Sequence, residues 1–215
     1  MDLRQGLRTF KVILGARPQE RAKIFSLLKL FERADRETAR FRARSKLQCV
    51  GGCGRCCENP HVETTVLEMM PLAIHLWQQG QADIWLDRSL EKSSQGTCIF
   101  FEPNPLVKGN GRCSVYPFRP LVCRLFGFAA SDNKYQKPQL VTCQTIKQVQ
   151  AQEYARAVTS VEAGEAVPKI RDFSLAASAL DPELSRELLP INEAVKVVIE
   201  KIGILRKIRT QVKNG

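Results

Sequence analysis

Apolar residues recur at helical spacing over the first clearly patterned stretch of the chain, from about Pro18 to Lys46. Proline suits a first helical turn, where its missing N–H would have no partner in any case. Arginine and lysine fill many of the other positions, so the pattern predicts an amphipathic helix with a basic outer face. The predicted inward-facing positions are Ile24, Leu27, Leu28, Phe31, Ala34, Thr38 and Phe41.

Two further helices are predicted after a glycine-rich loop. Thr65 and Glu68 have the spacing of a capping box, in which the two side chains satisfy backbone N–H groups at the start of a helix. We therefore expect a helix over Thr65–Gln79, ended by a glycine. A shorter helix is expected over Ala82–Lys92, and the polar residues 93–96 end it.

The middle of the chain contains two short segments of β character, Cys98–Phe101 and Cys113–Tyr116. Proline, asparagine and glycine lie between them and favour turns. A hairpin of these two segments would bring their leading cysteines close together. A helical turn is expected over Leu121–Phe126, then a polar loop at 131–138 and a further short strand over Gln139–Cys143.

The last third of the chain is helical by pattern. Apolar residues line one face between 146 and 161, and two more helices are predicted over Asp172–Leu180 and Asn192–Val212. The predicted fold class is therefore mainly α with a small irregular β-hairpin. In this arrangement a cysteine-rich metal-binding core is flanked by amphipathic helices.

The net charge of +11 is unevenly distributed. Residues 1–48 hold 13 Lys and Arg against 5 Asp and Glu, and residues 190–215 hold 6 against 2. Residues 49–189 are almost neutral, with 14 against 15. Basic ends suit an acidic protein or a nucleic acid as partner, although a helix with a solvated basic face is the simpler interpretation. No base-reading motif accompanies the charge.

The chain has no run of 18 apolar residues, so no membrane-spanning helix is predicted. The first residues, Met-Asp-Leu-Arg, lack the apolar core of a secretion signal, and we expect a cytoplasmic protein. In a reducing cytoplasm, eight cysteines favour metal ligands or reactive thiols over disulfides. Because eight is an even number, a disulfide framework stays open as the alternative.

The cysteines carry the candidate chemistry. Four of the eight lie within nine residues, at Cys49, Cys53, Cys56 and Cys57. Thiolates spaced C-x-x-C can reach one metal from a tight turn, and both zinc and iron–sulfur clusters usually take four such ligands. Eight thiols are enough for two mononuclear sites or one larger cluster. Neighbouring side chains tend to diverge, so the Cys56–Cys57 pair favours more than one metal ion.

The later thiols are expected to complete the site begun by this loop. They are Cys98, Cys113 and Cys123, with Cys143 in reserve. Arg55 and Arg124 stand next to predicted ligands, where a cation lowers thiol pKa values and offsets the charge of thiolates.

The sequence offers other possible metal ligands besides the cysteines. His61 is a possible ligand, whereas His75 lies in the middle of a predicted helix and suits a structural role. Glu68 and Glu102 are candidate oxygen ligands. A thioredoxin-like motif would need a βαβ context that is absent around Cys53 and Cys56. No Ser-His-Asp set and no phosphate-binding glycine loop is present, so any catalysis must come from the metal site.

Three segments together resemble a known family. They are Gly52-Cys-Gly-Arg-Cys-Cys57, Cys98-Ile-Phe-Phe-Glu102 and Gly111-Arg-Cys-Ser-Val-Tyr-Pro-Phe-Arg-Pro-Leu-Val-Cys-Arg124. This combination, spanning about residues 47–127, is similar to the YkgJ-type cysteine-cluster family, whose C-x-x-C-x-x-C-C domain is described as zinc- or iron-chelating. The present sequence departs from that signature because three residues, not two, separate Cys49 from Cys53.

The resemblance implies a ligand set as well as a metal. The implied ligands are Cys49, Cys53, Cys56, Cys57, Cys98, Cys113, Cys123 and Cys143. Bacterial flagellin lysine N-methylases are similar in the same signature, and the resemblance to them implies an iron–sulfur cluster. The methyl transfer does not carry over, because the chain shows no methyl-donor domain.

These observations lead to one expected function and two alternatives. We expect a cytoplasmic metal-binding protein that holds iron, as an iron–sulfur cluster, or zinc through cysteine thiolates. The alternatives are a metal-dependent or redox enzyme, and a basic interaction protein with structural zinc. The expected organisation is a basic helical extension at 1–46, a cysteine-cluster domain at 47–145, and a helical segment at 146–215 that packs on it.

Overall fold

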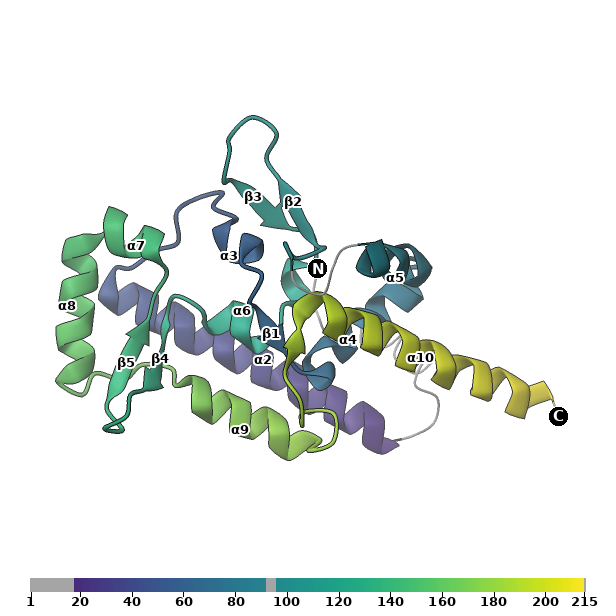
Figure 1. The fold of residues 1–215 in the computed structure, drawn as a ribbon. Helices are drawn as coiled ribbons and strands as arrows, with labels where there is room; N and C mark the ends of the chain where they lie inside the picture. Colours follow the sequence, from purple (N-terminus) through teal and green to yellow (C-terminus); the bar gives the residue numbers. More distant parts are fainter. Residues whose placement is uncertain (1–17, 92–95, 215) are drawn as a thin grey trace.

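The computed structural model describes residues 18–91 and 96–214, and the side chains up to residue 207. The first part of the extension predicted at 1–46 lies outside the described residues, as do Lys92 and most of the polar run at 93–96. The described chain is mainly helical with small antiparallel strand pairs, which confirms the predicted fold class. Figure 1 shows the arrangement.

The helices account for most of the described chain. They are α2 (Pro18–Ser45), α3 (Arg55–Glu58), α4 (Val66–Gln78), α5 (Ala82–Glu91), the 3-10 turn η1 (Tyr116–Phe118), α6 (Leu121–Leu125), α7 (Gln144–Val149), α8 (Ala151–Glu162), α9 (Ile170–Leu180) and α10 (Ile191–Asn214). Each long helix lies within a few residues of a predicted one. Among the described helices, none combines the length and the apolarity that crossing a membrane needs.

The strands form antiparallel pairs. β1 (Glu63–Thr64) pairs with β6 (Leu189–Pro190), β2 (Phe101–Pro103) with β3 (Gly111–Cys113), and β4 (Ala129–Asp132) with β5 (Pro138–Val141). The β2–β3 hairpin was predicted, but its strands lie closer to the turn than expected. Residues 98–100 form a turn instead of a strand, because the N–H of Phe101 bonds back to the carbonyl of Cys98. β4 and the β1–β6 pair were not predicted.

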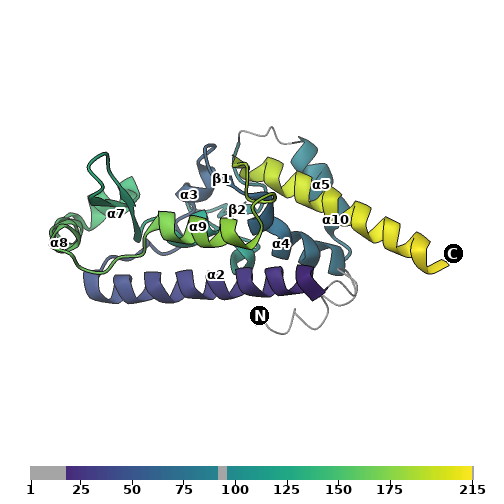
Figure 2. The ribbon, with the colours of Figure 1, turned by 90° about the horizontal axis from the view of Figure 1, so that it is seen from below.

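Helix α2 packs against helices from several parts of the chain. It is 28 residues long, runs along one side of the molecule, as Figure 2 shows, and contacts α4, α6, α8 and α9. All seven residues predicted to face inward are buried on it. Several of its cations are paired, Arg33 with Glu37 and Arg44 with Glu165 among them, which suits a solvated basic face.

The apolar side chains form two separate cores. The larger one joins the first half of α2 to α4, α9 and α10, with Phe31, Met70 and Ile199 fully buried in it. The smaller one lies at the other end of α2, where Phe41 meets Phe128 of the β4 region and Ile146 of α7. In Figure 1, α5 and α10 lie at the end of the molecule with the larger core, and α7 and α8 lie at the end with the smaller core.

The predicted capping box is confirmed at the start of α4. Thr65 stands at the N-cap position, and its hydroxyl accepts the N–H of Glu68 at 3.3 Å. Capping by threonine satisfies a donor that has no partner inside the helix. The helix ends near Gly80, whose φ of +67° is a left-handed conformation that glycine adopts without strain.

The buried face of α2 can be tested with two phenylalanines of the same helix. Phe31 is 0% exposed and Phe25 is 42% exposed. We expect Phe31→Ala to lower the free energy of unfolding by about 3–5 kcal/mol, because it leaves a cavity in the larger core. Phe25→Ala is the matched control and is expected to cost under about 1 kcal/mol. Urea unfolding followed by circular dichroism measures both, and equal losses would contradict the observed orientation of the helix.

Candidate metal centre

The eight cysteines come from six parts of the fold. Cys49 and Cys53 lie in the loop after α2, and the next two cysteines lie in α3. Cys98 precedes β2, Cys113 ends β3, and Cys123 lies in α6, while the last cysteine caps α7. All eight are free thiols, which is the state that metal ligation requires and not that of a disulfide framework.

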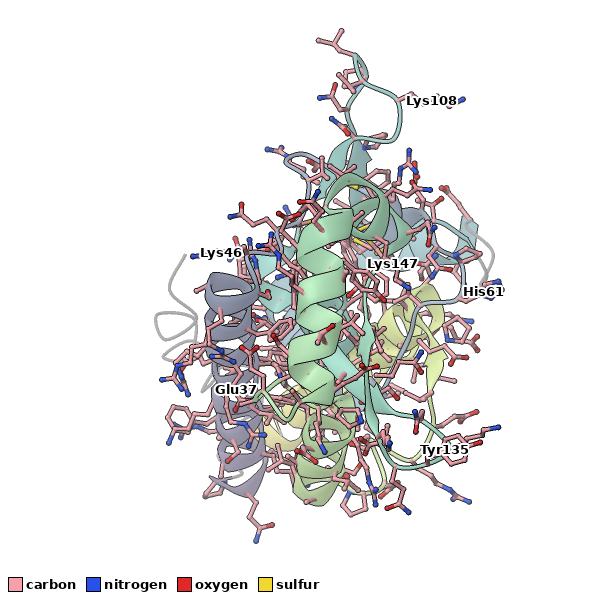
Figure 3. The ribbon with its side chains drawn as sticks, turned by 90° about the vertical axis from the view of Figure 1, so that its left-hand side faces the viewer. Glu37, Lys46, His61, Lys108, Tyr135 and Lys147 are labelled. Carbon is pink, nitrogen blue, oxygen red and sulfur yellow. The ribbon has the colours of Figure 1, made fainter. Side chains whose placement is uncertain are left out.

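The β2–β3 hairpin is bonded directly to the cysteine loop. The N–H of Gly111 donates to the carbonyl of Gly52 at 2.7 Å, and the N–H of Gly54 donates to the carbonyl of Gly109 at 3.3 Å. Cys53 also forms a β-bridge with Asn110. The stem of the hairpin therefore holds the loop, whereas its tip, marked by Lys108, projects from the body in Figure 3.

Two glycines permit this close approach. A Cβ atom on Gly54 would lie 2.1 Å from the ring of Phe101, and one on Gly111 would lie 2.3 Å from the same ring. Both distances are far below van der Waals contact. The aromatic ring thus fills the space between hairpin and loop, and only glycine fits at either position.

The segment that carries Cys98 is held from both sides. Its own N–H donates to the carbonyl of Cys57 at 2.9 Å, which joins it to α3. Asn192, at the start of α10 and 1% exposed, accepts the N–H of Ile99 at 3.0 Å and donates to the carbonyl of Thr97 at 3.2 Å. A buried amide that uses both of its ends in this way fixes the backbone on each side of the thiol.

Buried charged side chains hold the segment that carries Cys123. Glu68 accepts the N–H of Leu121 at 2.6 Å, and burial raises the pKa of its carboxyl group. Arg124 donates to the carbonyls of Pro117 and Arg119 at 2.5 and 2.7 Å and forms an ion pair with Asp35. Its guanidinium lies over the ring of Phe31. Arg124 therefore points into the core and fixes the chain.

Arg119 is a cation beside the thiols that sequence reasoning missed. Its guanidinium donates to the carbonyls of Tyr116 and Cys123 at 3.2 and 3.1 Å and stacks on the tyrosine ring, 3.5 Å from the centroid. Its charge acts to lower the pKa of Cys56, Cys113 and Cys123. The sequence does place Arg119-Pro120 shortly before Cys123. That position alone does not show that the arginine side chain points toward the thiols.

The thiols of this region lie close enough to change one another's ionisation. A hydrogen bond from the thiol of Cys57 lowers the pKa of Cys56 to about 6, and the same bond, followed by burial, raises the pKa of Cys57. Burial raises the pKa of Cys113 and, more strongly, that of Cys123, where the charge of Cys98 adds to the effect. The two adjacent cysteines also interact directly.

These thiols suit a metal ion by their chemistry. A buried thiol with a raised pKa is neutral on its own, and a bound cation supplies the charge that stabilises its thiolate. Arg119 partly offsets the negative charge that several thiolates would bring. Across the part of the chain that the structure describes, no three Cys, His, Asp or Glu side chains converge tightly enough, as they stand, to hold a metal ion. The thiols are therefore neighbours that have to turn toward a metal.

The other candidate donors lie apart from this group or are engaged elsewhere. His75 stacks on Phe118 at 4.5 Å, and burial lowers its pKa. His61 is exposed at the edge of the molecule in Figure 3. Glu102 is paired with Arg112 on the hairpin at 2.7 Å.

The cysteine region matches the model of a known family. A family model with the signature CxxCxxCC, described as "Putative zinc- or iron-chelating domain", matches residues 48–156. The chain belongs to this family. The match contains all eight cysteines and extends past the predicted 47–127 to include β4, β5 and α7. No curated protein and no solved structure matches the chain.

The close approach of hairpin and loop can be tested at Gly111. A methyl group there would meet the Phe101 ring at 2.3 Å and the carbonyl of Glu102 at 2.6 Å, so Gly111→Ala must displace the hairpin. We expect the free energy of unfolding to fall by about 1–3 kcal/mol and bound metal to fall with it. Gly51→Ala is the control, since nothing lies within 4 Å of its Cβ. Metal analysis and urea unfolding check both variants, and equal metal content in the two would refute this account.

The ionisation of the loop thiols predicts their reactivity in metal-free protein. With a pKa of about 6, Cys56 is largely thiolate at neutral pH, and its alkylation by iodoacetamide should rise with pH and level off near pH 7. Burial raises the pKa of Cys49 above the ordinary value of a thiol, so its labelling rate should still be rising at pH 7. Mass spectrometry after brief labelling measures both. Cys57→Ala removes the hydrogen bond and should slow labelling of Cys56 at pH 7, whereas an unchanged rate would count against the pair.

Proposed function

We propose that this protein binds iron, held as an iron–sulfur cluster, or zinc, through the thiolates of its eight cysteines. The observation that carries the proposal is the meeting of thiols from α3, the turn before β2, the end of β3 and α6. Soft thiolate ligands select zinc and iron–sulfur clusters over the hard cations that prefer oxygen.

The similarity of the cysteine signature to that of the flagellin lysine N-methylases supports iron–sulfur as the first choice. The number of thiols does not distinguish the two metals, because zinc and iron–sulfur clusters both usually take four thiolates. The cation of Arg119 beside the thiols suits a centre with several negative ligands. When bound, the metal centre would supply charge that holds the buried thiolates, with redox activity in the case of iron.

The protein's own residues position the ligands. Asn192 fixes the backbone around Cys98, while Glu68 and Arg124 fix the segment around Cys123. Residues that position metal ligands without binding the metal commonly change metal affinity by roughly 10- to 100-fold. The proposed division is a metal-binding part at 47–145, which contains Glu68 and Arg124, with helical segments before and after it. The later segment supplies Asn192, and the earlier one supplies Asp35, the partner of Arg124. A reducing, cytoplasmic location is part of the proposal, because free thiols persist there.

Metal and acid-labile sulfide per chain, measured in anaerobically purified protein, test this function. We expect iron with sulfide and a brown colour, and stoichiometric zinc in colourless protein would select the zinc alternative. Cys56→Ser and Cys123→Ser should each lower the bound metal at least about tenfold, because each removes a ligand. Ser131→Ala, on the exposed part of β4, is the control. Full metal content in both cysteine variants, or no metal in the wild type, would refute the proposal.

A further inference from the structure

The eight cysteines divide according to the apolar core that each one touches. Cys98 is buried in the larger core, and three more cysteines pack against it: Cys57, Cys113 and Cys123. Cys143 packs against the smaller core. Among the described residues, the three remaining thiols, those of Cys49, Cys53 and Cys56, belong to neither. One group of four thus faces the larger core, and the other four lie outside it.

Backbone contacts tie the start of the cysteine loop to the smaller core. The N–H of Gln48 donates to the side chain of Gln150 at 2.9 Å, and that side chain donates back to the carbonyl of Gln48 at 2.6 Å. Gln150 ends helix α7, and Cys143 caps the other end of the same helix. The loop residue that follows Gln48 is therefore held beside α7.

The two groups meet at adjacent residues of α3. Cys56 and Cys57 are consecutive residues of α3, and successive positions on a helix point about 100° apart. Cys56 is exposed, and Cys57 is half-buried against the larger core. The step from one residue to the next is therefore the boundary between an outer and an inner set.

We propose that the chain holds two separate four-thiolate sites. The inner site consists of Cys57, Cys98, Cys113 and Cys123, and the outer site of Cys49, Cys53, Cys56 and Cys143. Each set supplies the four ligands that a zinc or ferrous ion, or one iron–sulfur cluster, takes. This rests on the proposed function and adds to it a second site.

The two sites differ in access to solvent. The inner set includes the buried Cys98, and its other members are half-buried. Two members of the outer set, Cys49 and Cys56, are exposed. Metal at the outer site therefore exchanges with solution faster than metal at the inner site.

Cobalt(II) serves as the probe, because it binds tetrahedral thiolate sites and colours them. We expect anaerobic titration of the full, reduced chain to show about two cobalt ions per chain, one per four-thiolate set. Cys143→Ser should lose the outer ion and Cys98→Ser the inner one, leaving about one each. Addition of a chelator should remove cobalt from the wild type in a fast and a slow phase. The fast phase should be missing in Cys143→Ser and the slow phase in Cys98→Ser.

Other outcomes overturn the proposal and are distinguishable from failure of metal binding itself. One cobalt ion in the wild type, or loss of all cobalt in Cys143→Ser, would indicate a single shared cluster and leave the proposed function intact. If Cys143→Ser retained all of its cobalt, the proposed outer site would be contradicted. A wild type with neither native metal nor cobalt would end the proposed function as well. Cys113→Ser replaces Cys98→Ser if the latter does not fold, as judged by circular dichroism.

Discussion

The structure around the cysteines depends on the free-energy cost of bringing thiolates together beside an apolar core. The charge of each thiolate opposes the ionisation of its neighbours, and burial keeps Cys113 and Cys123 neutral until a cation is present. Arg119 supplies part of the opposite charge, and a metal must supply the rest. A site of this kind cannot be held by its own ligands while it is empty, so the surrounding fold has to bring the ligands together.

The fold brings the ligands together through buried polar side chains that hydrogen-bond to the backbone beside the cysteines and not to sulfur. Asn192 comes from α10, Glu68 from α4, and Asp35 of α2 anchors Arg124. Each spans a long stretch of sequence to fix one cysteine-bearing turn. Helices α2, α4 and α10 are thus part of the proposed metal site, although they contribute none of its sulfur. This explains why a short, irregular segment of chain can adopt one conformation.

Sequence reasoning succeeded where the determining forces are local. The periodicity of α2 and the capping box of α4 depend on residues a few positions apart, and both were predicted. The hairpin was misplaced because the apolar run at 98–100 has strand character, yet it is held as a turn by Asn192, 93 residues away. Arg124 was expected to face the thiols and faces the core instead. Which of two nearby arginines points inward depends on Asp35 and Phe31, which the local sequence does not show.

The cysteine loop also connects the two cores. Leu47 is buried in the smaller core, and Cys57 packs against the larger one, so the loop crosses between them within ten residues. Helix α2 joins the same cores through Phe31 and Phe41. The contact of Cys56 with Cys57 lies where this crossing reaches the larger core. Metal bound at the proposed sites would therefore tie the loop to both cores.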